Sequence, residues 1–123
     1  MTGPTVLDGR TPEAIAHAVK ILGAGGVVAI PTETVYGLAA ATHDPAAIAE
    51  VYRLKGRPTD NPLIAPVLDI EAAADLVCPG SLSDAVYRLA ELFWPGPLAM
   101  VLPKSDKVDP IATGGRDSIA IRA

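Results

Sequence analysis

The sequence predicts an α/β domain with a layered sheet and helices on its faces. Short apolar runs bounded by glycine and proline alternate with longer segments whose apolar residues recur at helical spacing. Strands and helices that alternate along a chain pack in this way because each buries an apolar face against the other. The 123 residues contain no internal repeat and no linker, so we expect one domain over residues 1–123.

The N-terminal part of the chain predicts a strand, a helix and a second strand. Residues 5–7 form a short apolar run, and Thr11-Pro12 is a typical helix start, an N-cap followed by proline. One face of this helix is apolar: Ile15, Val19 and Leu22. Glycines end it, and the apolar run 27–30 follows as a buried strand. Because these glycines follow a helix, they do not match the dinucleotide fingerprint, in which glycines open one.

The middle of the chain predicts two further strands around a helix. Residues 38–42 fit a strand or a helix, and we favour the strand. Asp44-Pro45 starts a helix that continues to residue 54. Residues 63–68 predict a strand that is either at a sheet edge or bulged, because Pro66 cannot donate a ladder hydrogen bond.

The C-terminal half predicts two helices and two strands. One helix opens at residue 69 or 70 and runs to 77, and the next covers 81–93 with Ser81 or Ser83 as its N-cap. The strands are expected at 98–102 and 119–121, with a polar loop between them. Little sequence follows the last strand to cover the sheet, and an uncovered edge or face favours pairing with a second copy.

Composition narrows the functional classes. The net charge of −4 and a pI near 5.0 do not favour a general nucleic-acid binder, although a local basic patch stays open. There is no apolar run of about 18 residues and no signal-peptide pattern, so we expect no membrane span. Cys78 is the single cysteine, which excludes an intrachain disulfide and favours a cytoplasmic location.

Two polar clusters follow predicted elements and suit an anionic ligand. Thr32–Gly37, rich in hydroxyl groups, comes directly after the strand 27–30. Lys55–Pro62 places a lysine and an arginine in a loop that two prolines stiffen. Read alone, the second cluster also fits a solvated basic loop at a helix end, where the helix dipole favours cations.

These clusters carry a resemblance to a known family. The motifs PTETVYGL, KGRPTDNPLI, FWPGPL and SIAIR occur at 31–38, 55–64, 93–98 and 118–122. In this order and spacing they resemble the YrdC-like threonylcarbamoyl-AMP synthase family. The resemblance implies a twisted open mixed sheet flanked by helices, apparently truncated at the C-terminus, since family members continue into a Ser-x-Asn motif. The chain would then be an incomplete YrdC-like domain.

The resemblance also implies an activity and its ligands. Family members are nucleotidyltransferases that join L-threonine, bicarbonate and ATP into threonylcarbamoyl-AMP and release pyrophosphate, for threonylcarbamoyladenosine modification of transfer RNA. Mg²⁺ is expected on the triphosphate, held by phosphate oxygens and water. Double-stranded RNA or transfer RNA and a second copy of the chain are candidate partners. The alternative is a catalytically inactive nucleotide- or RNA-binding remnant or fragment of the domain.

Site residues follow from the motif positions. The resemblance implies that Lys55 and Arg57 are catalytic and clamp the phosphates of ATP, and that Asn61 and Ser118 also contact the nucleotide. It implies that Thr34 and Arg122 contact threonine, with Thr32 and Tyr36 as second candidates. No Asp/His cluster predicts a metal site, and His17 and His43 fit surface or capping positions.

Each assignment has a plainer structural alternative. Thr34 fits a turn in which its hydroxyl bonds the backbone, and Asn61 fits an Asx turn before Pro62. Ser118 and Arg122 fit an ordinary strand. Two positions depart from the family pattern: Pro66 replaces the usual histidine, which removes a polar threonine contact, and Ala99 replaces a common threonine.

Overall fold

The computed structural model describes residues 3–123, so the first two residues of the predicted domain lie outside it. The chain divides into two compact units, Met1–Val51 and Tyr52–Ala123, which are described here separately. Both contain helices and strands, and the predicted α/β class is confirmed. The assignment of residues 1–123 to one domain stays a prediction.

The first unit begins with helix α1, Pro12–Gly23, which starts where the sequence predicts. Thr11 is its N-cap, and its hydroxyl accepts a hydrogen bond from the Ala14 amide at 3.2 Å. Ala14 is buried, but Ile15 and Val19 on the expected apolar face are exposed. Residues 5–7 form no strand, so that prediction was wrong.

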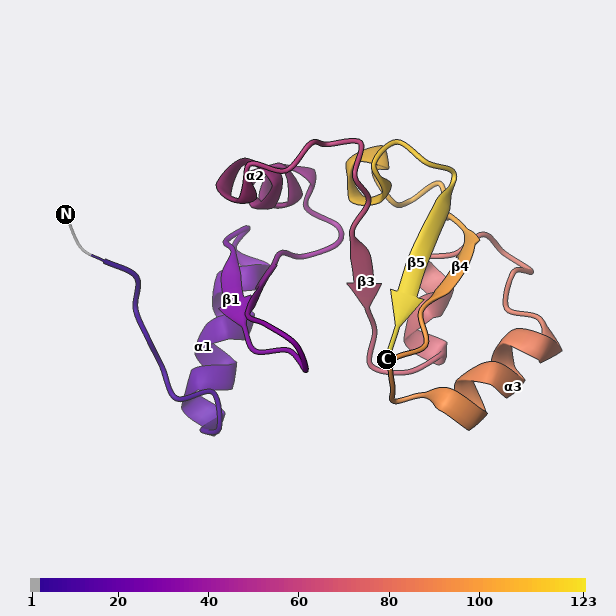
Figure 1. Cartoon of the computed structure of the whole chain (residues 1–123), viewed down its shortest axis with the longest axis horizontal. Coiled ribbons are helices and arrows are strands. Elements are labelled where there is room, and N and C mark those ends of the chain that lie inside the picture. Colours follow the sequence, from indigo (N-terminus) through magenta and orange to yellow (C-terminus); the bar gives the residue numbers. More distant parts are fainter. Residues whose placement is uncertain (1–2) are drawn as a thin grey trace. The chain divides into compact units, whose positions relative to one another are not determined.

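A two-stranded antiparallel sheet follows, built from β1, Val28–Ile30, and β2, Gly37–Ala39. Val28 pairs with Ala39, and α1 lies against β1 (Figure 1). Residues 38–42 were expected as a strand, which β2 confirms in its first part. The turn Gly25–Gly26 joins α1 to β1, as the glycine pattern predicts, and Gly25 has a φ of +87°.

Helix α2, Pro45–Lys55, runs across the division between the units. The Asp44 carboxylate accepts a hydrogen bond from the Ala47 amide at 3.1 Å and caps its first turn, as predicted. One side of the helix is buried: Ala47, Ile48, Val51 and Tyr52. Its last turn carries Arg53 and Lys55, where cations complement the negative end of the helix dipole.

The second unit is built on a mixed three-stranded sheet (Figure 1). Strand β5, Ser118–Arg122, lies in the centre, parallel to β3, Ile64–Pro66, and antiparallel to β4, Met100–Pro103. Pro66 lies in an edge strand, one of the two positions its missing N–H allows. Alternate residues of β5 are buried, with Ile121 fully inside.

Three short helices complete this unit: η1, Glu71–Asp75, α3, Asp84–Phe93, and η2, Pro110–Thr113. The helix expected from residue 69 or 70 to 77 is only a short 3₁₀ segment, because Val77 instead forms a β-bridge with Lys104. Helix α3 begins after Ser83, one of its two predicted caps. No helix among residues 3–123 is long and apolar enough to cross a membrane.

Replacing Ser83 by alanine is expected to lower the free energy of unfolding by about 1 kcal/mol. The Ser83 hydroxyl accepts a hydrogen bond from the Val86 amide at 3.3 Å, and alanine leaves that amide without the cap. Urea unfolding measures the loss. Ser81→Ala, two residues upstream of the cap, is the control, and equal losses in the two variants would contradict the cap assignment.

Candidate functional site

Three of the predicted site residues lie at the end of α2 and in the loop that joins it to β3: Lys55 is the last residue of the helix, and Arg57 and Asn61 follow in the loop. Gly56 ends the helix with a φ of +61°, and the Arg57 amide then donates to the Tyr52 carbonyl at 3.0 Å. The Asn61 amide donates to the Pro58 carbonyl at 3.1 Å, which closes a turn. These backbone bonds, together with the fixed φ of the prolines, give the loop a defined conformation.

The Arg57 side chain is half-buried beside this turn, whereas Lys55 is exposed. The Arg57 Nη2 donates to the Pro62 carbonyl at 2.7 Å, and the Arg57 Nε is buried without a hydrogen-bond partner among the described residues. One end of the guanidinium is therefore held by the loop itself. The guanidinium therefore keeps one donor, the buried Nε–H, that the described residues leave without an acceptor.

Tyr52 lies beneath the loop and is only 2% exposed. Its hydroxyl lies 2.9 Å from the Asn61 carbonyl and 3.2 Å from the Ile111 carbonyl, to which it can donate. Burial raises the pKa of this phenol above its ordinary value of 10.0, although the positive charges of Arg57 and Arg116 oppose the rise. The hydroxyl is therefore protonated, and able to donate, throughout the neutral range.

A turn between η2 and β5 closes against the same loop. The hydroxyl of Thr113, 1% exposed, donates to the Arg116 carbonyl at 2.7 Å. Gly114 has a φ of +61° and approaches the loop so closely that a Cβ atom there would lie 2.8 Å from the Asp60 carbonyl oxygen. Arg116 Nη1 donates to that same oxygen at 3.0 Å. This turn thus fixes Asp60 in the middle of the cationic loop.

Strand β5 supplies the other two predicted residues of this unit, at its opposite ends. Ser118 begins the strand, and the loop enters the parallel strand β3 at the corresponding end. Arg122 ends the strand, roughly 13 Å from Ser118 along β5, and pairs with Pro66 of β3. The Arg122 Nε donates to the Gly96 carbonyl at 2.7 Å. Ser118 therefore lies toward the cationic loop, and Arg122 lies toward the FWPGPL segment.

The predicted threonine contacts of the first unit lie in the turn between β1 and β2. The Thr32 hydroxyl accepts from the amides of Thr34 and Val35 at 3.3 and 3.2 Å, and donates to the Val35 carbonyl. The Thr32 hydroxyl therefore builds the turn through its bonds to the backbone. The Thr34 hydroxyl lies 3.3 Å from the Thr32 hydroxyl, and Tyr36 is 78% exposed. This turn presents Thr34 and Tyr36 at the surface.

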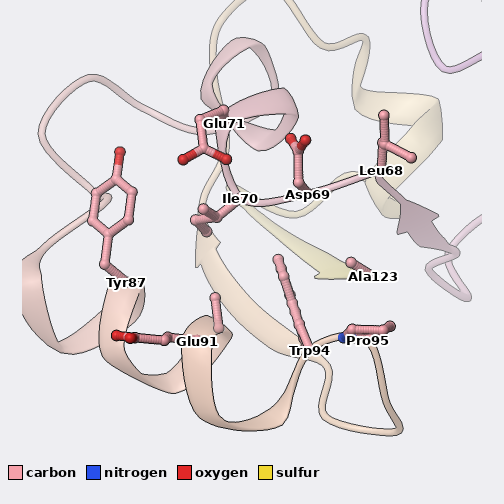
Figure 2. Close-up of a pocket in the computed structure, with 10 residues that line it drawn as sticks. Leu68, Asp69, Ile70, Glu71, Tyr87, Glu91, Trp94, Pro95 and Ala123 are labelled. Carbon is pink, nitrogen blue, oxygen red and sulfur yellow. The ribbon is translucent and has the colours of Figure 1, made fainter.

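A separate cavity of about 360 Å³ in the second unit contains none of the predicted site residues. Its lining includes the carboxylates of Asp69, Glu71 and Glu91, and Figure 2 shows them around it, with the Trp94 ring pointing into the cavity. Three carboxylates at neutral pH repel a phosphate. We therefore place the candidate anion site at the Lys55–Pro62 loop and not in this cavity.

Sequence reasoning missed three residues that shape the loop: Tyr52, Gly114 and Arg116. In the sequence, Tyr52 fits the apolar side of the helix predicted from Asp44-Pro45 to residue 54, with no sign of a contact to the loop. For Gly114, the sequence does offer a signal: a pair of glycines follows Thr113, and such a pair commonly marks a turn with positive φ. Nothing in the sequence indicates that this turn packs against a loop far away in the chain.

The raised pKa of Tyr52 predicts a pH dependence of stability. Because the folded state has a higher pKa than the unfolded value of about 10, this contribution is complete below pH 10 and is lost as the pH rises through the folded pKa. Tyr52→Phe removes the ionisation, so its stability relative to the native chain should improve above pH 10. Urea unfolding at pH 8 and pH 11 tests this, and a difference that does not change with pH would contradict it.

The structure thus shows an α/β fold and an ordered loop that carries cationic side chains. The chain belongs to the Sua5, YciO and YrdC family, whose family model, described as "Telomere recombination", matches residues 20–123. This confirms the family resemblance of the four motifs.

Individual relatives agree with the family assignment. The threonylcarbamoyl-AMP synthases of Pyrococcus abyssi and Bacillus subtilis are each 44% identical to this chain, over 108 and 109 residues. A crystal structure of Pyrococcus abyssi Sua5 complexed with L-threonine matches with a TM-score of 0.82, also at 44% identity. Each match covers 88% of this chain but 31% of the relative, so the chain spans about a third of their length.

Proposed function

We propose that this chain is the part of a threonylcarbamoyl-AMP synthase that grips the phosphates of ATP and contacts L-threonine. The observation that carries the proposal is the Arg57 guanidinium, half-buried and anchored to Pro62, with a buried Nε that has no partner among residues 3–123. A buried donor without a partner costs roughly 1–3 kcal/mol, which a phosphate oxygen would relieve once the guanidinium turns toward it. Kinship with curated synthases supports ATP as the source of that phosphate.

The proposed reaction needs positioning and positive charge more than a reactive side chain. The threonine amine takes up bicarbonate with loss of water, and the resulting carbamate oxygen attacks the α-phosphorus while pyrophosphate leaves. Charge builds on the phosphate oxygens during this displacement. We assign its stabilisation to Lys55 and Arg57 as catalytic residues, because Arg offers a planar fork and Lys a compact charge. Asn61 and Ser118 would orient the nucleotide.

The Pyrococcus abyssi protein solved with L-threonine supports threonine as the second ligand. We assign its contacts to the Thr34 hydroxyl and the Arg122 guanidinium, which would pair with the threonine carboxylate. The bond from Arg122 Nε to the Gly96 carbonyl holds the guanidinium in one orientation. Tyr36 is a second candidate, and Thr32 acts through the turn that presents Thr34.

Mg²⁺ enters the proposal only as a companion of the triphosphate. The described part of the chain has no group of three or more His, Cys, Asp or Glu side chains that could hold a metal ion. A magnesium ion on ATP takes most of its ligands from phosphate oxygens and water. We therefore assign it no protein ligand and no step of its own.

The proposal is tested by calorimetry with ATP and magnesium, with and without L-threonine and bicarbonate, while pyrophosphate is assayed in the same samples. We expect ATP binding and pyrophosphate release that requires both threonine and bicarbonate. Samples that lack one of these two substrates are the controls. Absence of ATP binding would contradict the proposal.

The alternative is a nucleotide-binding domain without catalysis, and Pro66 is the observation that favours it. Pro66 occupies the position of the family's histidine and pairs with Arg122, so it lies beside a proposed threonine contact without offering a polar group. ATP binding without pyrophosphate release would support this alternative. Binding of transfer RNA, pairing with a second copy and a cytoplasmic location also stay predictions.

A further inference from the structure

The loop that carries Arg57 and Asn61 is attached at both of these residues to Tyr52. The Tyr52 carbonyl accepts the hydrogen bond of the Arg57 amide at 3.0 Å, and the Tyr52 hydroxyl is 2.9 Å from the Asn61 carbonyl. One buried residue thus contacts the backbone at the two loop positions to which we assign nucleotide contacts. Its side chain spans the distance between them.

The same hydroxyl connects the loop to a third segment. It lies 3.2 Å from the carbonyl of Ile111 in η2, which is far away in sequence. Because Tyr52 is 2% exposed, water does not compete for these bonds. The end of α2, the cationic loop and η2 therefore meet at one phenol oxygen.

We propose that Tyr52 is a positioning residue for the nucleotide site. It sets the separation of the Arg57 guanidinium from the side-chain amide of Asn61. The inference rests on the proposed function, because it supposes that these two side chains contact ATP. Tyr52 itself would not touch the nucleotide. It acts by fixing the peptide at Asn61, while the neighbouring Asp60 carbonyl is held by Arg116 at 3.0 Å.

Preorganisation gives this arrangement its functional value. A loop that is already ordered loses less conformational entropy when it binds phosphate than a mobile one does. The Asp60 carbonyl accepts from Arg116, and the Asn61 carbonyl accepts from the Tyr52 hydroxyl. Neither of these two peptide groups can therefore rotate without breaking a hydrogen bond. Loss of the phenol hydroxyl should release one of these two restraints and leave the ring packing unchanged.

The test is Tyr52→Phe, with Tyr87→Phe on the exposed face of α3 as the matched control. Two readouts are needed: amide hydrogen exchange in the ligand-free chain, and calorimetric affinity for ATP with magnesium. In Tyr52→Phe, exchange at Asn61 should rise roughly three- to tenfold, as expected for the loss of one hydrogen bond, and exchange at Ile121 in β5 should change less. ATP affinity should fall over a similar range, and Tyr87→Phe should match the native chain.

The outcomes separate the inference from the function on which it rests. Unchanged exchange at Asn61 would overturn the positioning role, whatever happens to ATP affinity. Equal rises at Asn61 and Ile121 would also overturn it, because they would indicate a loss of global stability only. If the native chain bound no ATP while Tyr52→Phe still released Asn61, the proposed function would be wrong and the loop anchor would stand.

Discussion

Arg57→Ala is expected to weaken ATP binding by roughly 1.5–3 kcal/mol, or about one to two orders of magnitude. The guanidinium is half-buried, so its bonds to phosphate are screened less by water and salt than those of the exposed Lys55. Arg57→Lys keeps the charge but removes the planar fork, and should fall between the native chain and the alanine variant. Calorimetry with ATP and magnesium measures all three.

Arg88→Ala is the control for the loss of one positive charge. Arg88 is exposed on α3, in the same unit but outside the cationic loop. A general electrostatic effect would weaken ATP binding equally in the two alanine variants, and that result would contradict the phosphate clamp. A loss confined to Arg57→Ala would support it.

Stability should respond much less than binding in Arg57→Ala. The substitution leaves the Pro62 carbonyl without its 2.7 Å donor, which destabilises the folded state. It also removes the buried Nε that has no partner among the described residues, which relieves a desolvation cost. Because these effects oppose each other, a urea midpoint near that of the native chain, combined with weak ATP binding, would identify a residue kept for a ligand.

The sequence predicts those parts of the fold that local chemistry determines. Thr11, Asp44 and Ser83 each accept a backbone hydrogen bond at a helix start, which depends on a side chain and the turn beside it. Pro66 likewise restricts its strand to an edge or a bulge because it has no N–H. In these cases a few neighbouring residues contain all of the relevant physics.

Predictions fail where a distant segment decides the outcome. The helix expected to reach residue 77 stops at Asp75, because Val77 pairs with Lys104 and the Cys78 amide donates to the Pro103 carbonyl at 2.8 Å. Local periodicity cannot reveal a partner strand so far along the chain. The apolar run 5–7 has too few residues to form a strand without such a partner.

The candidate site divides in the same way. Motifs predict Lys55, Arg57 and Asn61 as site residues because the residues that would contact the ligand lie close together in the sequence. The residues that hold the loop are not visible in the motif, since Tyr52 resembles any apolar helix position and Arg116 is distant in sequence. Local sequence thus predicts the chemistry of the site, and tertiary packing supplies its geometry.

Gly114→Ala should destabilise the second unit by roughly 1–3 kcal/mol more than Gly115→Ala, the cost expected for forced overpacking. Both glycines have positive φ, +61° and +81°, so both substitutions introduce backbone strain. At Gly114 the new Cβ would also lie 2.8 Å from the Asp60 carbonyl oxygen and 3.1 Å from the Pro62 nitrogen, whereas at Gly115 nothing lies within 4 Å. Urea unfolding of the two variants isolates the contact with the loop.

The same pair of variants tests whether the loop conformation matters for the ligand. Relief of the Gly114→Ala contact requires Asp60 and Pro62 to move, and Asn61 must move with them because it lies between them. ATP affinity should therefore fall in Gly114→Ala and be retained in Gly115→Ala. Equal unfolding free energies would show that the loop tolerates the shift. Equal ATP affinities despite unequal stability would show that the positions of Asp60–Pro62 do not control nucleotide binding.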